Sequence, residues 1–372
     1  MKHAKSTIEA LLLGTGVTIN GPEPQDIMVH NPKFYARVLK DGTLGFGESY
    51  VEGWWDCKDL DVLFYKLFSK EIEKKLTTNW RLVFLIVKAK LFNLQSKSRA
   101  QKSISHHYDI GNKLYKEMLD PLMMYSCGYW KGASTLKEAQ EQKLKLICEK
   151  LKLEPGQKVL DIGCGWGGFA FYAATNYRVN VVGITISNEQ KKLATERCKN
   201  LNVEIRLQDY RDINEKFDRI VSIGMLEHVG YKNYRNFMEV ICQNLTEKGI
   251  ILLHTIGNNE TNLSLDPWIH KYIFPNGLIP SIAQIGKAIE GKLIVEDLHN
   301  IGIHYDYTLL AWKENFKNSW NKLSPDYDTA FYRMWNYYLS SSAASFRSRR
   351  LNLWQIVLTK PSFHQQYESV RF

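Results

Sequence analysis

The sequence has no apolar run long enough to span a bilayer. Its longest runs, residues 82–87 and 169–174, have six residues each, whereas a membrane-spanning helix needs roughly eighteen or more. Lys2 and Lys5 precede an apolar stretch at residues 10–13, which is shorter than the signal-peptide core of about seven to fifteen residues. These absences predict a cytoplasmic protein that does not cross a membrane.

Cysteine is scarce, and its spacing gives no pairing. None of the six cysteines forms a Cys-x-x-Cys pattern with another. This arrangement supports neither a zinc site nor a disulfide framework, so we expect no metal and interpret most of these side chains as buried thiols. The sequence also lacks internal repeats and extended low-complexity tracts.

Basic residues are in excess, with a net charge of +10. This charge favours an anionic partner, either nucleic acid or an anionic membrane surface, and does not by itself separate the two. With 372 residues, of which 44% are hydrophobic, the chain exceeds one typical domain and can bury a substantial core. We therefore expect a large catalytic domain and a smaller accessory domain.

A change of composition predicts the domain boundary. Residues 1–94 carry glycine-rich turns at 40–47 and an apolar segment at 80–92, and are interpreted as a small α+β accessory domain with a helical exit. Residues 95–105 are polar and basic and contain four serines, which is typical of a surface linker. The catalytic domain is predicted to cover residues 106–372.

Strand-like runs alternate with helix-length segments in the predicted catalytic domain. Thr135 and Glu138 form a capping box, so a helix is expected to begin at Leu136 and to end before Pro155. The predicted strands are residues 159–162, 179–184, 203–207, 219–223 and 250–254, and the helix-length segments between them include residues 188–200 and 233–245. The alternation predicts a doubly wound, Rossmann-like α/β sheet.

Two further segments complete this prediction. Residues from 255 to about 321 interrupt the alternation and are expected to enclose the substrate, since long insertions of this kind are often functional. Residues 351–359 are predicted to form a last strand at the sheet edge.

The first predicted strand runs into a glycine-rich turn, Asp161-Ile-Gly-Cys-Gly-Trp-Gly-Gly168. Its glycines allow a tight turn and let a ligand lie against bare backbone. A dinucleotide site would also need an acid at the end of the second strand to hold a ribose, and residues 181–185 contain none. Together with Gln208-Asp209-Tyr210 after the third strand, the turn predicts an S-adenosylmethionine site.

Ligands of open α/β sheets bind at the carboxyl ends of the strands. Two such positions carry groups that can move protons: Glu227 follows the fourth predicted strand and His254 ends the fifth. A carboxylate and an imidazole at adjacent strand ends are interpreted as catalytic groups beside the cofactor.

Five spaced motifs carry a family resemblance: His106-His-Tyr-Asp-Ile-Gly-Asn112, Tyr125-Ser-Cys-Gly-Tyr-Trp130, Val159-Leu-Asp-Ile-Gly-Cys-Gly-Trp-Gly-Gly168, Met225-Leu-Glu-His-Val-Gly230 and Tyr272-Ile-Phe-Pro275. Through them the chain resembles the cyclopropane-fatty-acyl-phospholipid synthases. The region before the linker also resembles the N-terminal domain of these bacterial enzymes, which the related mycolic-acid cyclopropane synthases lack. The likeness favours membrane phospholipid over mycolate as the substrate.

The resemblance implies that S-adenosylmethionine donates its methyl group to the cis double bond of an unsaturated acyl chain in a phospholipid, and that the resulting cation loses a proton as the cyclopropane ring closes. An alkene is a weak nucleophile, so the site must align it, exclude water and supply a base. Aromatic faces can stabilise the cation; the candidates are Tyr125, Tyr129, Trp130, Trp268 and Tyr305.

The same resemblance implies that the base is a bound bicarbonate ion. Its ligands would be Cys127, Glu227, His254, Tyr305 and the backbone of Ile256. Glu227 would repel this anion unless it shares the bicarbonate proton or is itself protonated.

For the cofactor site, the resemblance adds a larger set to Asp161. These residues are Tyr125, Ser126, Gly163, Cys164, Gly165, Thr185, Ile186, Gln190, Gln208, Asp209 and Tyr210. One departure from the family concerns the C-terminal Tyr-Tyr-Leu-x-x-Cys segment of many members, which reads Tyr337-Tyr-Leu-Ser-Ser-Ser342 here. A cysteine at that position is therefore not an essential nucleophile if this chain is active.

The partners follow from resemblance and charge. The resemblance implies a homodimer. Two basic groups are candidates for peripheral docking on the inner face of the cell membrane, although a solvated basic face explains them equally well. They are Lys97, Arg99 and Lys102, and Arg347, Arg349 and Arg350.

Three alternative functions fit parts of the sequence. A nucleic-acid methyltransferase suits the net charge, but the chain has neither an Asn-Pro-Pro-Tyr-like turn after the fourth strand nor a Pro-Cys pair, so no nucleic-acid partner is expected. A methyltransferase of lipids, headgroups or small molecules is the main alternative. A non-catalytic membrane module would leave Cys127, Glu227 and His254 without a role.

Overall fold

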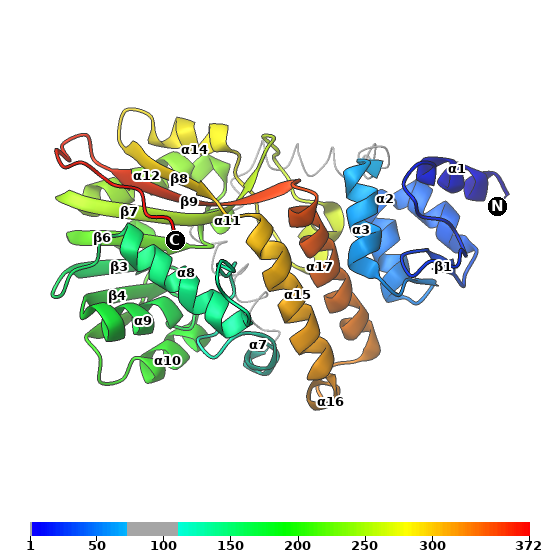
Figure 1. The fold of residues 1–372 in the computed structure, drawn as a ribbon, viewed down its shortest axis with the longest axis horizontal. Coiled ribbons are helices and arrows are strands. Elements are labelled where there is room, and N and C mark those ends of the chain that lie inside the picture. Colours follow the sequence, from blue (N-terminus) through cyan, green and yellow to red (C-terminus); the bar gives the residue numbers. More distant parts are fainter. Residues whose placement is uncertain (1, 73–110) are drawn as a thin grey trace. The chain divides into compact units, whose positions relative to one another are not determined.

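The computed structural model describes residues 2–72 and 111–372 (Figure 1). The predicted linker at 95–105 and the apolar segment at 80–92 lie outside the described residues, as do Lys97, Arg99, Lys102 and most of the first motif. The chain forms two compact units. The first combines the N-terminal part of the chain with Leu263–Pro275 and Asp306–Leu351, and the second contains the rest of the described residues.

The first unit is mainly helical. Its N-terminal part contains α1 (Lys2–Leu12), α2 (Lys33–Val51) and α3 (Leu60–Ser69), with one antiparallel pair of two-residue strands, β1 (Met28–Val29) and β2 (Trp55–Asp56). The predicted glycine-rich turns at 40–47 lie inside α2, so that prediction was wrong. Only Gly42 departs from helical geometry, with φ 59°, and there α2 is kinked.

Helices from later in the sequence complete the first unit. They are α13 (Pro267–Tyr272), most of α15 (Ile303–Asn318), α16 (Trp320–Leu323) and α17 (Thr329–Arg347). Asp61 of α3 forms ion pairs with Lys313 of α15 at 2.8 Å and with Arg347 of α17 at 3.0 Å. The accessory region thus shares a compact unit with two segments that the sequence analysis assigned to the catalytic domain.

The second unit is built on a seven-stranded sheet with strand order β5-β4-β3-β6-β7-β9-β8. The strands are β3 (Lys158–Ile162), β4 (Asn180–Thr185), β5 (Val203–Leu207), β6 (Phe217–Ile223), β7 (Leu245–Asn258), β8 (Ile294–Asn300) and β9 (Leu351–Thr359). The first five are parallel, and β8 runs antiparallel to β9. This arrangement confirms the doubly wound α/β prediction.

Helices cover both faces of this sheet (Figure 1). Leu160 and Ile162 pack toward α12 (Tyr234–Asn244) and α14 (Ile282–Ile289). Val159, one position out of phase, packs toward α8 (Leu136–Lys150) and α9 (Gly168–Tyr177). Because strand side chains alternate, Asp161 shares the α8 face with Val159.

The order of the last strands corrects a prediction. Residues 351–359 do form a strand, but β9 lies between β7 and β8, and β8 is the edge strand. Eight of the nine residues of β9 are buried, as expected of a strand with a neighbour on each side.

In residues 2–72 and 111–372, none of the helices has the length and hydropathy that a membrane-spanning segment needs.

Candidate active site

The glycine-rich turn links β3 to α9 at the carboxyl ends of the parallel strands. Gly163, Gly165 and Gly167 have φ values of 79°, 53° and 77°, a region that favours glycine. The backbone N–H groups of Gly163 and Cys164 both donate to the carbonyl of Ile184 at 3.0 Å. The turn is therefore fixed against β4, next to the predicted cofactor residues that follow that strand.

Asp161 ends up buried beneath this turn. It is 2% exposed, and its Oδ2 has no hydrogen-bond partner among the described residues. Burial raises its pKa to about 7, and the charge of Lys143 opposes this rise. A buried acid with a free oxygen suits a ligand that supplies a hydrogen-bond donor.

Residues after β4 form a second polar group of the candidate cofactor site. The Thr185 hydroxyl donates to Oε1 of Gln190 at 2.8 Å, and both side chains are buried. Ser187 caps α10 (Asn188–Arg197), accepting from the backbone N–H of Gln190. The cap fixes Gln190 at the start of α10, directly after the turn that contains Ile186.

The residues after β5 already have partners in the structure. Both carboxylate oxygens of Asp209 accept from Arg211 at 2.7 Å. Gln208 donates to the carbonyl of Asp212 at 2.9 Å. Tyr210 is 5% exposed and belongs to the core beneath α12. A ligand here would have to share the side chains of Gln208 and Asp209 with these partners.

The Tyr125-Ser-Cys127 segment lies against α8 and the glycine-rich turn. The ring of Tyr125 meets that of Tyr115, which in turn contacts Trp166 of the turn, with centroids 5.1 and 4.9 Å apart. Ser126 Oγ accepts a hydrogen bond from Nζ of Lys143 at 2.9 Å. Cys127 is fully buried. The structure therefore brings this motif to the predicted cofactor loop.

Glu227 lies in α11 (Leu226–Val229), directly after β6. Its Oε1 accepts a hydrogen bond from the backbone N–H of Ile256 at 2.7 Å, and its Oε2 has no partner in the described part of the chain. Burial raises the pKa of this carboxyl to about 7. Two predicted catalytic positions, Glu227 and Ile256, are thus in direct contact.

His254 pairs with Ile223 across β6 and β7. Its Nδ1 lies 3.3 Å from Nε2 of Gln355, and its Nε2 has no partner among the residues described. Burial and the charges of Lys143 and Lys150 lower its pKa well below the usual value. This shift favours the neutral ring, and if the Gln355 amide donates to Nδ1, the ring proton is on Nε2.

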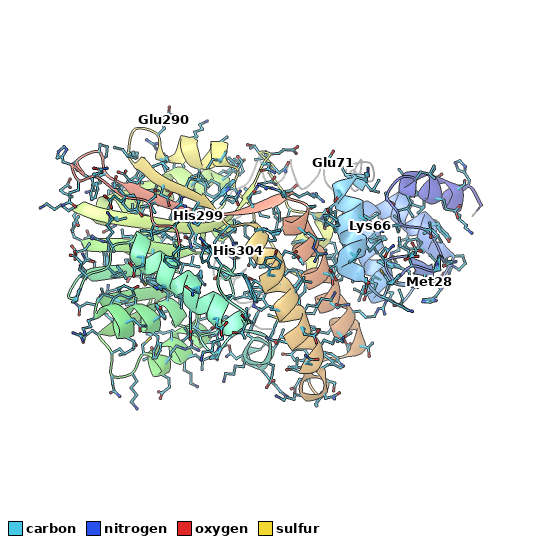
Figure 2. All side chains as sticks on the ribbon, viewed as in Figure 1. Met28, Lys66, Glu71, Glu290, His299 and His304 are labelled. Carbon is cyan, nitrogen blue, oxygen red and sulfur yellow. The ribbon has the colours of Figure 1, made fainter. Side chains whose placement is uncertain are left out.

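The aromatic candidates divide between the two units. Tyr305 is buried near the start of α15 and directly follows His304 in the sequence. His304, labelled in Figure 2, accepts at Nδ1 from the backbone N–H of Trp130 at 2.7 Å. The Tyr129 ring stacks on His304 with centroids 4.9 Å apart. Trp268 instead belongs to the first unit, where its ring contacts Tyr337.

The sequence analysis missed two polar side chains that contact predicted site residues. Lys143 holds Ser126, and Gln355 holds His254. Both had a signal in the sequence. Lys143 occurs four residues before the apolar Ile147 of α8, and Gln355 interrupts the apolar run of β9. A polar residue on a buried face needs a specific partner.

Comparisons with known proteins show the family of the chain. The family model described as mycolic acid cyclopropane synthetase matches residues 95–356. The chain is 54% identical over 350 residues to the cyclopropane-fatty-acyl-phospholipid synthase of Escherichia coli K12, covering 94% of this chain and 92% of that protein. A probable fatty acid methyltransferase of Pseudomonas putida is 32% identical, with 92% and 89% covered.

Solved structures give the same result. The cyclopropane synthase MmaA2 of Mycobacterium tuberculosis aligns with a TM-score of 0.66 and 31% identity, covering 70% of this chain and 98% of that one. The mycolic acid cyclopropane synthase CmaA1, solved with SAH and CTAB, aligns with a TM-score of 0.64, also at 31% identity, with 70% and 98% covered. The chain belongs to the mycolic acid cyclopropane synthetase family of S-adenosylmethionine-dependent methyltransferases.

Proposed function

We propose that this enzyme transfers a methylene unit from S-adenosylmethionine to the cis double bond of an unsaturated acyl chain in a membrane phospholipid, forming a cyclopropane ring. The observation that carries the proposal is the pair of buried groups Glu227, just after β6, and His254, which lies inside β7 opposite the last residue of β6 rather than at a strand end as predicted, each with one unpartnered polar atom. The 54% identity to the Escherichia coli synthase supports the phospholipid as substrate.

The proposed cofactor site lies at the carboxyl ends of β3, β4 and β5. When bound, S-adenosylmethionine supplies the electrophilic methyl group. A Cβ on Gly165 would meet nothing within 4 Å, so this glycine leaves room for a ligand against the backbone. Asp161 Oδ2 is available to accept a hydrogen bond, and Thr185 and Gln190 form a buried polar pair beside the turn. The chain's task is orientation, because a weak alkene nucleophile reacts only when it is aligned with the methyl carbon.

We also propose bicarbonate as the base, held near Cys127, Glu227, His254, Ile256 and Tyr305. The neutral His254 offers a free Nε2–H, and the buried Lys143 adds positive charge that favours an anion. The raised pKa of Glu227 favours its protonated form, in which Oε2–H would donate to the anion. The Ile256 N–H already donates to Glu227, so this backbone group would act by orienting the carboxyl.

Peripheral membrane association and a homodimer remain part of the proposal. Among the basic residues suggested for docking, Arg347 forms ion pairs with Asp61 and Asp306 at 3.0 and 2.9 Å. Its charge is therefore committed within the first unit, and we remove it from the docking group.

Lipid extracts test the function. The chain is expressed in a host that makes no cyclopropane lipids, and its phospholipid acyl chains are compared by mass spectrometry with those from cells expressing Glu227→Gln. We expect unsaturated chains to gain one methylene only with the wild type, and the variant to lose activity by about 100-fold or more while keeping S-adenosylhomocysteine binding. Unchanged acyl chains with methylated headgroups would assign the enzyme to the alternative class.

A further inference from the structure

Lys143 is a fully buried cation on α8 with an unusual partner. Its side chain has no exposed surface, and its Nζ donates to the hydroxyl oxygen of Ser126 at 2.9 Å. Within residues 2–72 and 111–372 it forms no ion pair. Burying an ammonium group without a carboxylate in direct contact is costly. Burial lowers the pKa of Lys143 to about 8, and the nearby charges of Asp120 and Asp161 offset only part of this effect. Packing alone therefore does not account for this lysine.

The loop that carries Ser126 is held in place by other groups. Gln140, one turn before Lys143 on α8, donates to the carbonyl of Ser126 at 2.8 Å. The carboxylate of Asp120 accepts from the backbone N–H groups of Leu122 and Met124 at 2.9 and 2.8 Å. These bonds fix the backbone of the loop, whereas Nζ of Lys143 donates to the Ser126 side chain.

This contact sets the direction of the serine hydroxyl. An ammonium group can only donate, so Ser126 Oγ must accept from it. The hydroxyl proton of Ser126 is then directed away from Lys143 and is available to an acceptor. In the proposed cofactor site, the anionic acceptor on S-adenosylmethionine is its carboxylate.

Several ionisable groups surround Lys143. Asp120 and Cys127 lie on the loop before α8, Asp161 on β3 and His254 on β7, and each interacts electrostatically with the lysine or is influenced by its charge. The lysine therefore lies where the predicted cofactor residues and the predicted catalytic residues meet.

We propose that Lys143 is a positioning residue for the methyl donor, which orients the Ser126 hydroxyl toward the donor's carboxylate and attracts that carboxylate by its buried charge. The inference rests on the proposed function, because it assumes that Ser126 faces S-adenosylmethionine.

The test compares two ligands on matched variants. S-adenosylhomocysteine carries the carboxylate, and 5′-methylthioadenosine lacks it. Lys143→Met should weaken S-adenosylhomocysteine binding by about tenfold or more and leave 5′-methylthioadenosine binding unchanged, as measured by calorimetry. The KM for S-adenosylmethionine should rise, with the KM for phospholipid vesicles unaffected.

Lys150→Met is the control. Lys150 is also fully buried on α8, but it is paired with Asp297 at 3.1 Å. This variant should lower the thermal midpoint without changing the affinity ratio of the two ligands. Ser126→Ala should show the same kind of ligand selectivity as Lys143→Met, and the double variant should be no worse than Lys143→Met alone. If Lys143→Met does not fold, the affinities of Ser126→Ala for the two ligands are the deciding measurement.

Equal losses for both ligands, or no loss for either, in Lys143→Met or Ser126→Ala would overturn the inference. The proposed function fails by a different result. A wild-type protein that binds S-adenosylhomocysteine with the predicted selectivity but forms no cyclopropane lipid would refute that function and leave the role of Lys143 intact.

Discussion

Single residues of the site keep buried polar atoms without partners. Oδ2 of Asp161, Oε2 of Glu227 and Nε2 of His254 are the examples in the predicted site. Each such atom costs about 1–3 kcal/mol when it is left unsatisfied. A ligand that supplies the missing partner would offset this cost, so these atoms are candidates for ligand contact.

The first prediction concerns Asp161. The folded state holds its pKa at about 7, above the ordinary aspartate value of 3.8, so between these values the unfolded chain releases a proton that the folded chain keeps. Stability from this group therefore falls as pH rises from about 4 to about 7. The asparagine in Asp161→Asn does not titrate. The free energy of unfolding of this variant, relative to the wild type, should therefore increase across this range by at most about 4 kcal/mol.

Urea denaturation of the ligand-free protein at pH 5 and pH 8 measures this effect. The same variant should bind S-adenosylhomocysteine more weakly, because asparagine replaces one carboxylate oxygen with an NH₂ group, which cannot accept a hydrogen bond from the ligand. A variant that is less stable than the wild type at pH 8 would show that Asp161 already has a partner in the free protein.

Elements differ in how far the sequence predicted them. The capping box of Thr135 and Glu138 is confirmed at the start of α8, because a cap depends on residues only three positions apart. The edge strand β8 was missed. Its register shifts between Val295 and Asp297, and this irregularity breaks the alternation that identifies a strand. The burial of Lys143 depends on a loop that packs over α8, which no local pattern reveals.

The candidate site shows the same difference between local signals, which the sequence reveals, and long-range packing, which it does not. Asp161, Glu227 and His254 were chosen from the sequence because the carboxyl ends of parallel strands converge by topology, and the structure buries all three side chains. Gln355 supports His254 from β9, a strand whose place in the sheet was predicted wrongly. Side chains that contact the candidate residues from sequence-distant elements therefore escaped prediction.

The second prediction concerns the close approach of α2 to α13. A Cβ on Gly47 would lie 2.4 Å from Cδ1 of Trp268, whereas one on Gly286 in α14 would meet nothing within 4 Å. Gly47→Ala should therefore destabilise the protein by about 1–3 kcal/mol. Gly286→Ala, the matched control, should stabilise it by about 0.5–1 kcal/mol. Thermal denaturation compares the two, and equal midpoints would contradict the packing of Trp268 on Gly47.

At the scale of the whole molecule, the N-terminal part is not an independent appendage. It shares a compact unit with Leu263–Pro275 and Asp306–Leu351. The solved relatives MmaA2 and CmaA1 align over 98% of their own length and only 70% of this chain. In this chain, the N-terminal residues therefore pack with segments that come much later in the sequence.

The last prediction tests this shared unit through Asp61, whose carboxylate pairs with Lys313 and Arg347. These partners outweigh burial and lower its pKa, so its stabilising effect is present above the unfolded pKa near 4 and is lost as pH falls through the lower folded value. Asp61→Asn should cost about 1–3 kcal/mol at pH 7, and the difference from the wild type should shrink below about pH 4. Glu23→Gln, at an exposed carboxylate of the same unit, should change little. A loss that is equal at pH 7 and pH 3 would assign the effect to packing and reject the ion pairs as the link between α3, α15 and α17.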